Sequence, residues 1–131
     1  YVPHDETPRY LSAFDLLVLP SETQPNWKEQ FGRVITESLA CGTPVIGSDS
    51  GEIPNLIQSS EGGLVFPERN AEEFARALRT MIQSPSLREQ YAAKGMSWTN
   101  AHISLQAVAE KMAATINHAV KQKTLHATAN S

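Results

Sequence analysis

The chain has 131 residues, of which 40% are hydrophobic and 19% charged, a composition typical of one ordinary globular domain rather than of a disordered or fibrous protein. Its net charge is -3, its pI is about 5.8, and it has no basic block, which argues against nucleic acid or an anionic membrane surface as a partner. Cys41 is the single cysteine, and no apolar run approaches the roughly 20 residues that span a bilayer, so we expect a reducing cytoplasmic setting and no transmembrane segment.

The first half of the chain is expected to alternate helices and strands. The sequence predicts a helix from His4 to Phe14 and a strand from Asp15 to Pro20, whose continuous apolar run is typical of a strand buried on both faces of a parallel sheet. A polar loop from Ser21 to Lys28 follows that strand. The loop lies at the carboxyl end of the strand, where open α/β sheets bind ligands.

Further helices and strands continue this pattern. A helix is predicted from Gly32 to Ala40, because Cys41-Gly42 is a helix stop signal. Strands are expected at Pro44–Gly47 and Gly62–Pro67, with a short helix from Pro54 to Gln58 between them. This order predicts an α/β fold with a Rossmann-like parallel sheet and flanking helices.

The last third of the chain is expected to be helical. A capping-box pattern, Asn70 followed by Glu73, starts a helix that continues to about Ile82. A second helix begins at Ser84-Pro85 and runs to about Lys94, and residues 95–100 are expected to form a turn.

A long final helix is expected from Leu105, because apolar residues recur with three- and four-residue spacing as far as Val120. Residues 124–131 show no apolar pattern, which predicts a frayed or disordered tail after one structural unit over residues 1–123. The chain opens on Tyr1 with neither an initiator Met nor a basic, apolar leader, so we expect a fragment of a longer protein.

The most informative stretch runs from Glu29 to Gly42. Gly32 permits close backbone approach at the point where a helix begins, and the first amides of a helix lack internal partners and carry the positive end of its dipole, so anions bind there. Glu29 lies before this helix and Glu37 lies inside it, reaching roughly 8 Å along its axis. The two acids could therefore span the sugar and the leaving group of a nucleotide.

Five features follow one another in a specific order. They are Pro20-Ser21 at a strand end, Glu29-x7-Glu37 across Phe31-Gly32, the run from Ala40 to Ile46, Asp49-x-Gly51-x-x-Pro54, and Gly63-Leu64-Val65. With these features the chain resembles, from about Val2 to Trp98, the retaining GT-B glycosyltransferases of family four, the group 1 glycosyl transferases. The resemblance implies the latter half of the C-terminal domain of a two-domain enzyme, which binds a nucleotide-diphosphate sugar between its domains and transfers the sugar with retention of configuration.

The resemblance also implies roles for the residues of the motif. Glu29 would be catalytic and approach the donor sugar, whereas Glu37 would accept hydrogen bonds from the ribose hydroxyls. The backbone amides around Phe31, Gly32 and Arg33 would face the sugar and the diphosphate of the donor. Further candidate contacts to donor or acceptor are Ser21, Trp27 and Lys28.

Partners and cofactors are expected from the same resemblance. It implies no metal ion and no cofactor, and no cluster of His, Asp and Glu has ligand spacing. In the family, an Arg and a Lys that precede the segment matched here neutralise the diphosphate. The implied partners are an N-terminal domain of the same chain and an acceptor that is a sugar, a lipid or a small molecule. The isolated chain is expected to be inactive, and peripheral membrane association through the absent domain stays open.

A second hypothesis is a Rossmann-like nucleotide-binding or regulatory module without chemistry, because a fold alone does not imply a function. Glu52 and Asn55 depart from the commonest family pattern, which has a glycine and an acid at these positions, and this blurs the identity of donor and acceptor. Lys28 and Arg33 are as readily solvated cations as ligand contacts. Cys41 is expected to be a packing residue, and the four His residues are expected at the surface or in packing contacts.

Overall fold

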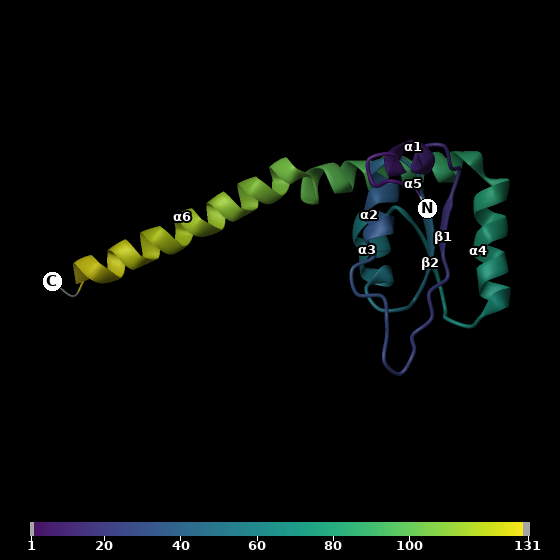
Figure 1. Ribbon diagram of the computed structural model, residues 1–131, viewed down its shortest axis with the longest axis horizontal. Coiled ribbons are helices and arrows are strands. Elements are labelled where there is room, and N and C mark those ends of the chain that lie inside the picture. The colour runs from purple at the N-terminus through teal and green to yellow at the C-terminus, as the bar shows by residue number, and fades with distance from the viewer. Residues whose placement is uncertain (1, 130–131) are drawn as a thin grey trace. The chain divides into compact units, whose positions relative to one another are not determined.

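The computed structural model describes the backbone of residues 2–129 and the side chains of residues 2–122 (Figure 1). The chain divides into two compact units, of which the first ends at Thr99 and the second begins at Asn100. The second unit contains helix α6 (Leu105–Ala129). The first unit contains the sheet and the other helices, which are α1 (Thr7–Leu11), α2 (Arg33–Ala40), α3 (Ile53–Ser60), α4 (Ala71–Gln83) and most of α5 (Pro85–His102).

The sheet has three parallel strands in the order β1-β2-β3. The strands are β1 (Leu17–Leu19), β2 (Val45–Ser48) and β3 (Gly63–Phe66). Ile46 in the central strand pairs with Val18 on one side and Leu64 on the other. Each crossover between strands contains a helix, α2 and then α3, as parallel connections require. The α/β fold with a parallel, Rossmann-like sheet is therefore confirmed.

Two hydrophobic clusters hold helices against the two faces of the sheet. Val45 faces the cluster formed with α2 and α3, and its neighbour Ile46 faces the cluster formed with α4, because successive strand side chains point to opposite faces. In Figure 1, α2 and α3 accordingly lie on one side of the strands and α4 on the other. The fully buried side chains of the first cluster include Ile35, Leu39 and Ile53.

The first predicted helix and strand differ from the structure. The helix expected from His4 to Phe14 is limited to α1, and the strand expected from Asp15 to Pro20 is limited to β1. The prediction that this strand is buried on both faces is wrong, because its residues are only half-buried. The physical reason is its position: among the described residues, β1 forms one edge of the sheet.

The turn predicted over residues 95–100 is also wrong, because α5 continues through this segment to His102. Gly95 is buried inside the helix, and a Cβ atom there would lie 2.5 Å from Cδ2 of Leu39 and 3.3 Å from Cα of Gly62. Close packing of α5 against other elements, rather than a chain turn, therefore explains this glycine. The interruption comes later, at 103–104, where Ser104 Oγ accepts a hydrogen bond from the Ala107 amide and caps α6.

The tail expected from Thr124 overlaps the end of α6, which continues to Ala129, and residues 130 and 131 lie outside the described residues. Among the helices of the described chain, none has the length and apolar character needed to cross a bilayer.

Candidate functional site at the start of helix α2

The segment between β1 and α2 begins with a narrow turn. Gln24 and Trp27 exchange two backbone hydrogen bonds, from Gln24 N to Trp27 O (2.7 Å) and from Trp27 N to Gln24 O (3.2 Å). Pro25 and Asn26 occupy the corner of this turn, where both residue types are favoured. Trp27 is 53% exposed and Lys28 is also exposed, so the turn presents both side chains to solvent.

Gly32 sets the geometry at the start of α2. It is the N-cap residue of the helix and has φ 51° and ψ 36°, in the left-handed region that favours glycine. Its amide donates a hydrogen bond of 3.1 Å to Oε1 of Glu29, which places a half-buried carboxylate at the positive end of the helix dipole. Phe31, between them in the sequence, is 72% exposed.

The backbone of Glu29 is fixed from the opposite side by the loop after β2. The Glu52 amide donates to the Glu29 carbonyl oxygen at 3.0 Å. Gly51 has φ 56°, and a Cβ atom at this position would lie only 1.9 Å from the same oxygen. The close approach of the two loops therefore requires glycine at position 51.

Glu52 and Asn55, the two departures from the commonest family pattern, contact each other. Asn55 Nδ2 donates to Oε2 of Glu52 at 3.1 Å at the start of α3. The two substitutions thus form one local polar pair beside the loop that fixes Glu29.

Glu37 lies one turn into α2, on the same side as Arg33. Arg33 Nη2 and Glu37 Oε1 are 3.6 Å apart, and the guanidinium is largely exposed, so this pair adds little to stability. Partial burial and the charge of Glu37 raise the pKa of the Cys41 thiol, which keeps it in the neutral form and agrees with a packing role.

Two structural features of the start of α2 suit an anionic ligand with hydroxyl groups. The first amides of a helix have no partner within it, and Gly32 has no side chain that could cap them, so the Arg33 and Val34 amides can bind an anion. Glu29 and Glu37 are half-buried carboxylates and can accept hydrogen bonds from hydroxyl groups.

A hollow of about 330 Å³ lies at the carboxyl ends of the strands. Ser21, Ser48, Glu68 and Phe74 are among the residues that line it. The Ser48 hydroxyl donates to the Ser21 carbonyl oxygen at 2.5 Å, joining the ends of β2 and β1. Of the site residues predicted from sequence, Ser21 lines this hollow and the acid pair does not.

The structure thus places the predicted site residues in three groups. Glu29, Phe31, Gly32, Arg33 and Glu37 lie along the start of α2, where the sequence predicted them. Trp27 and Lys28 are on the exposed turn that precedes this group, and Ser21 is at the end of β1.

Sequence reasoning did not find the contacts of Glu68 and Arg69, which follow β3. Glu68 accepts hydrogen bonds from Thr23, and Arg69 contacts Glu22 and Thr23. The sequence did offer one indication of these contacts: both residues follow the carboxyl end of a strand, and the loops at these ends meet at one edge of a parallel sheet.

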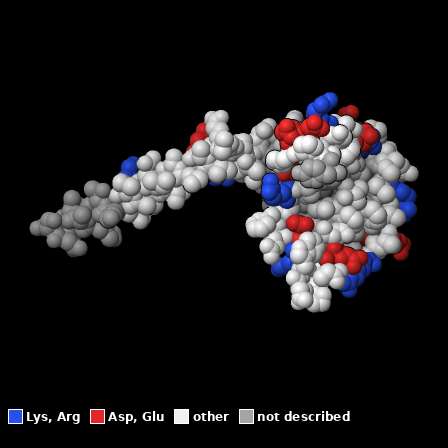
Figure 2. All heavy atoms as spheres, viewed as in Figure 1, with Lys and Arg blue, Asp and Glu red and all other residues white. Residues whose placement is uncertain are grey.

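Charges of both signs surround these residues. On the face shown in Figure 2, Lys and Arg are interspersed with Asp and Glu over the first unit. Within the described part of the chain, no group of three or more His, Cys, Asp and Glu side chains could hold a metal ion.

The chain is similar to known proteins along most of its length. The family model described as Glycosyl transferases group 1 matches residues 1–98. The D-inositol 3-phosphate glycosyltransferase of Thermobifida fusca (strain YX) is 32% identical over 102 residues, which cover 73% of this chain and 22% of that protein.

Two solved structures share the fold. Sucrose-phosphate synthase from Thermosynechococcus elongatus has a TM-score of 0.75 at 28% identity, covering 92% of this chain and 29% of that one. HepE of Anabaena, solved in complex with UDP, has a TM-score of 0.72 at 23% identity, covering 85% of this chain and 29% of its own; this likeness shows the fold alone. The chain spans between 22% and 29% of the length of these three proteins, and the expectation that its α/β sheet corresponds to part of a GT-B fold is confirmed.

Proposed function

We propose a function from the premise that this chain belongs to the group 1 glycosyl transferases, whose family model matches residues 1–98. The function is to bind a nucleotide-diphosphate sugar at the start of α2 and, in the full-length protein, to transfer the sugar to an acceptor with retention of configuration. The observation that carries this proposal is the juxtaposition of Glu29 with the first turn of α2, through the hydrogen bond from the Gly32 amide.

Charge development in the reaction explains why this juxtaposition suits sugar transfer. The bond from the anomeric carbon to the diphosphate breaks, an acceptor oxygen bonds to that carbon, and the acceptor hydroxyl gives its proton to the departing diphosphate. Negative charge grows on the departing diphosphate, and the Arg33 and Val34 amides at the positive end of α2 would stabilise it. Glu29, beside the same helix end, would face the sugar at the reacting carbon.

Glu37 has a separate role in this proposal. It lies farther along α2, where its carboxylate would accept hydrogen bonds from the ribose hydroxyls. Arg33 is exposed and its contact with Glu37 is weak, so its guanidinium would leave Glu37 and contact the ligand at little cost in free energy. Ser21, Trp27 and Lys28 stay candidate contacts to donor or acceptor.

The names of related proteins support a sugar transferase without identifying its substrates. The Thermobifida relative is a D-inositol 3-phosphate glycosyltransferase, and HepE was solved with UDP and with UDP-glucose. We therefore choose UDP and UDP-glucose as first probes, alongside sugars carried by other nucleoside diphosphates.

Several expectations about the whole protein remain part of this proposal. They are an N-terminal domain in the same chain, a sugar, lipid or small-molecule acceptor, a cytoplasmic setting with peripheral membrane association left open, and no resident metal or cofactor. The chain alone is expected to be inactive, because the basic residues expected to neutralise the diphosphate lie outside it.

The proposal is tested with the full-length protein and a panel of nucleotide-diphosphate sugars. Calorimetry should identify a donor that binds, and the anomeric NMR signal of the product should show the configuration of that donor. Glu29→Gln should lower kcat by at least about tenfold, because the carboxylate acts on charge that develops in the transition state. Glu89→Gln, at an exposed position on α5, is the matched control.

A second experiment separates donor binding from transfer. Glu37→Ala should weaken donor binding by about tenfold to a hundredfold, because hydrogen bonds to charged groups contribute about 1.5–3 kcal/mol each. Wild-type transfer by a Glu29→Gln, Glu37→Ala double variant with every donor would contradict the proposal. Binding without transfer by the wild-type protein would instead favour the nucleotide-binding module.

A further inference from the structure

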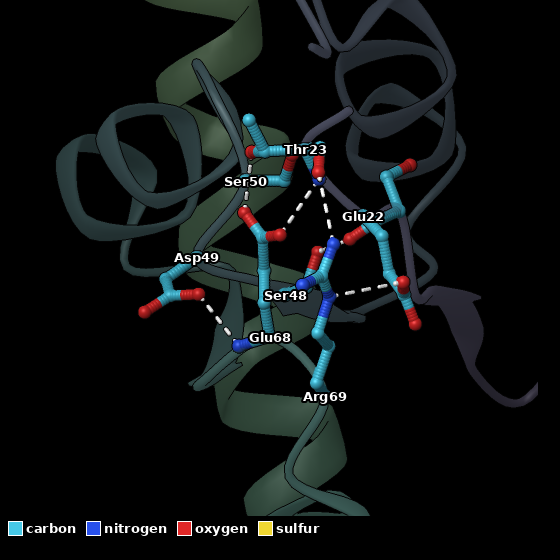
Figure 3. A network of polar contacts seen from close by, with 8 residues as sticks. Glu22, Thr23, Ser48, Asp49, Ser50, Glu68 and Arg69 are labelled. Atoms are coloured by element: carbon cyan, nitrogen blue, oxygen red, sulfur yellow. Dashed lines mark hydrogen bonds and ion pairs between the residues drawn. The ribbon is translucent and has the colours of Figure 1, made fainter. Parts of the chain in front are cut away.

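Two carboxylate hydrogen bonds connect the loop before α2 to the loop after β3 (Figure 3). Thr23 donates from its amide to Glu68 Oε2 and from its hydroxyl to Glu68 Oε1, both at 2.6 Å. The Thr23 hydroxyl also lies 3.0 Å from the hydroxyl of Ser50. Both oxygens of Glu68 are therefore engaged by one residue, 45 positions away in the sequence.

Arg69 adds a second pair of contacts to the same loop. Its Nε lies 3.3 Å from Glu22 Oε2, and its Nη2 donates to the Thr23 carbonyl oxygen at 3.3 Å. The Glu68 amide in turn donates to Asp49 Oδ1 at 2.7 Å, which fixes the β3–α4 loop to the end of β2. Arg69 has φ 60°, an uncommon backbone conformation for a residue with a side chain.

We call five residues the loop clamp: Glu22, Thr23, Ser50, Glu68 and Arg69. The clamp holds one end of the segment from Thr23 to Glu29, and the hydrogen bond from Glu52 N to Glu29 O holds the other. The Gln24–Trp27 turn shortens the path between the two anchors. The position of the Glu29 carboxylate and of the α2 amides beside it thus depends on both anchors.

We propose that Glu68 is a positioning residue: through Thr23 it fixes the segment that presents Glu29 and the first turn of α2 to the ligand. This inference rests on the proposed function for the identity of the ligand, but the ordering of residues 21–32 is a property of the free protein. Two polar side chains of the neighbouring hollow have partners within the chain: the Ser48 hydroxyl donates to the Ser21 carbonyl oxygen, and Asn70 Oδ1 accepts from the Glu73 amide. The clamp contacts themselves all lie within the chain, so they can order the loop without a ligand.

Hydrogen exchange in the full-length protein, without ligand at pH 7, tests the clamp. Glu68→Gln should speed exchange of the amides in residues 21–32 by about tenfold, because the charged acceptor of both Thr23 hydrogen bonds is lost. Thr23→Val should have a smaller effect of the same kind, whereas Thr23→Ser, which keeps the hydroxyl, should behave as wild type. Peptides from α4 should be unchanged, and Glu89→Gln is the control for loss of an exposed carboxylate.

UDP binding measured by calorimetry tests the link to function. Glu68→Gln and Thr23→Val should each weaken UDP binding by about threefold to tenfold. The double variant should lose no more affinity than Glu68→Gln alone, because the two substitutions remove the same interaction between Thr23 and Glu68. Unchanged exchange in residues 21–32 of Glu68→Gln would overturn the proposal. Faster exchange with unchanged UDP affinity would overturn the positioning role. If the wild type does not bind UDP, the choice of a uridine donor fails, and exchange alone decides whether Glu68 orders the segment.

Discussion

At the scale of single residues, close backbone contacts make the candidate site sensitive to very small changes. Gly51 touches the Glu29 carbonyl oxygen, and Gly32 needs a left-handed conformation at the start of α2. These two positions determine where a carboxylate and a helix end meet. The chemistry proposed for Glu29 therefore depends on residues that carry no functional group of their own.

Gly51→Ala should be more destabilising than Gly42→Ala. Both glycines have positive φ, so each substitution carries a backbone cost of about 1 kcal/mol. A Cβ atom at Gly51 would also meet the Glu29 oxygen at 1.9 Å, whereas at Gly42 the nearest atom is Met96 Sδ at 4.0 Å. We expect Gly51→Ala to lower the free energy of unfolding by about 1–3 kcal/mol more than Gly42→Ala in denaturant titrations. Equal losses of unfolding free energy in the two variants would show that the loop containing Glu29 moves away from the added methyl group without cost.

The pH dependence of the clamp follows from Glu68. Hydrogen bonds from Thr23, the largest cause, lower the pKa of this carboxyl, and its neighbours Ser50 and Arg69 act in the same direction. Because the folded pKa is below the unfolded one, the stability from Glu68 is complete above the unfolded value of about 4.3 and is lost as pH falls through the folded value. Glu22 and Arg69 are the other charged members of the clamp, and Asp49 accepts a hydrogen bond from the Glu68 amide.

The measurement is the difference in Tm between the wild-type protein and Glu68→Gln from pH 3 to pH 7. We expect the wild type to have the higher Tm at neutral pH and the difference to shrink below about pH 4. A difference that stays constant over this range would show that ionisation of Glu68 does not stabilise the loop.

At the scale of helices and strands, Gly95 contributes through packing. Alanine normally favours a helix over glycine by about 1 kcal/mol. Here an added methyl would lie 2.5 Å from Leu39 Cδ2, in a part of the core that is fully buried. Gly95→Ala should therefore lower the free energy of unfolding, by about 1–3 kcal/mol, instead of raising it. The control is Ala93→Gly, at an exposed position of the same helix, which measures in the same denaturant titration how much stability a helix loses when glycine replaces alanine.

The sequence predicted the elements better than it predicted the contacts between them. Stop signals and apolar runs located α2, β2 and β3 to within one or two residues, because these signals are local. Gly95 was misassigned, because a packing glycine and a turn glycine look the same in one sequence. The Thr23–Glu68 contact spans 45 positions, and no local pattern encodes it. The acid pair was identified through its spacing and the family resemblance, whereas the residues that hold it needed the structure.

At the scale of the whole molecule, the chain spans under a third of the related proteins described above, so its site is proposed to be completed by residues outside it. Charge balance on the diphosphate is the clearest example. In the proposed complex the α2 amides would supply part of it, and the basic residues expected upstream would supply the rest.

Metal removal tests this view of charge balance in the full-length protein. If helix amides and basic side chains neutralise the diphosphate, then treatment with EDTA followed by buffer exchange should leave kcat for sugar transfer within about twofold of its starting value. Loss of transfer with recovery on adding Mg²⁺ or Mn²⁺ would contradict the expectation that no metal is needed. A transferase known to need a metal ion serves as the control for complete chelation.

The edge position of β1 has a consequence for the isolated chain. Its outer N–H and C=O groups have no strand partner among the described residues, and its sequence, Leu-Val-Leu, has none of the charges or prolines that usually prevent strand addition. In the longer protein proposed above, a further parallel strand would cover this edge. Without one, two copies of the chain can pair edge to edge, so the isolated chain should self-associate as its concentration rises, independently of any ligand.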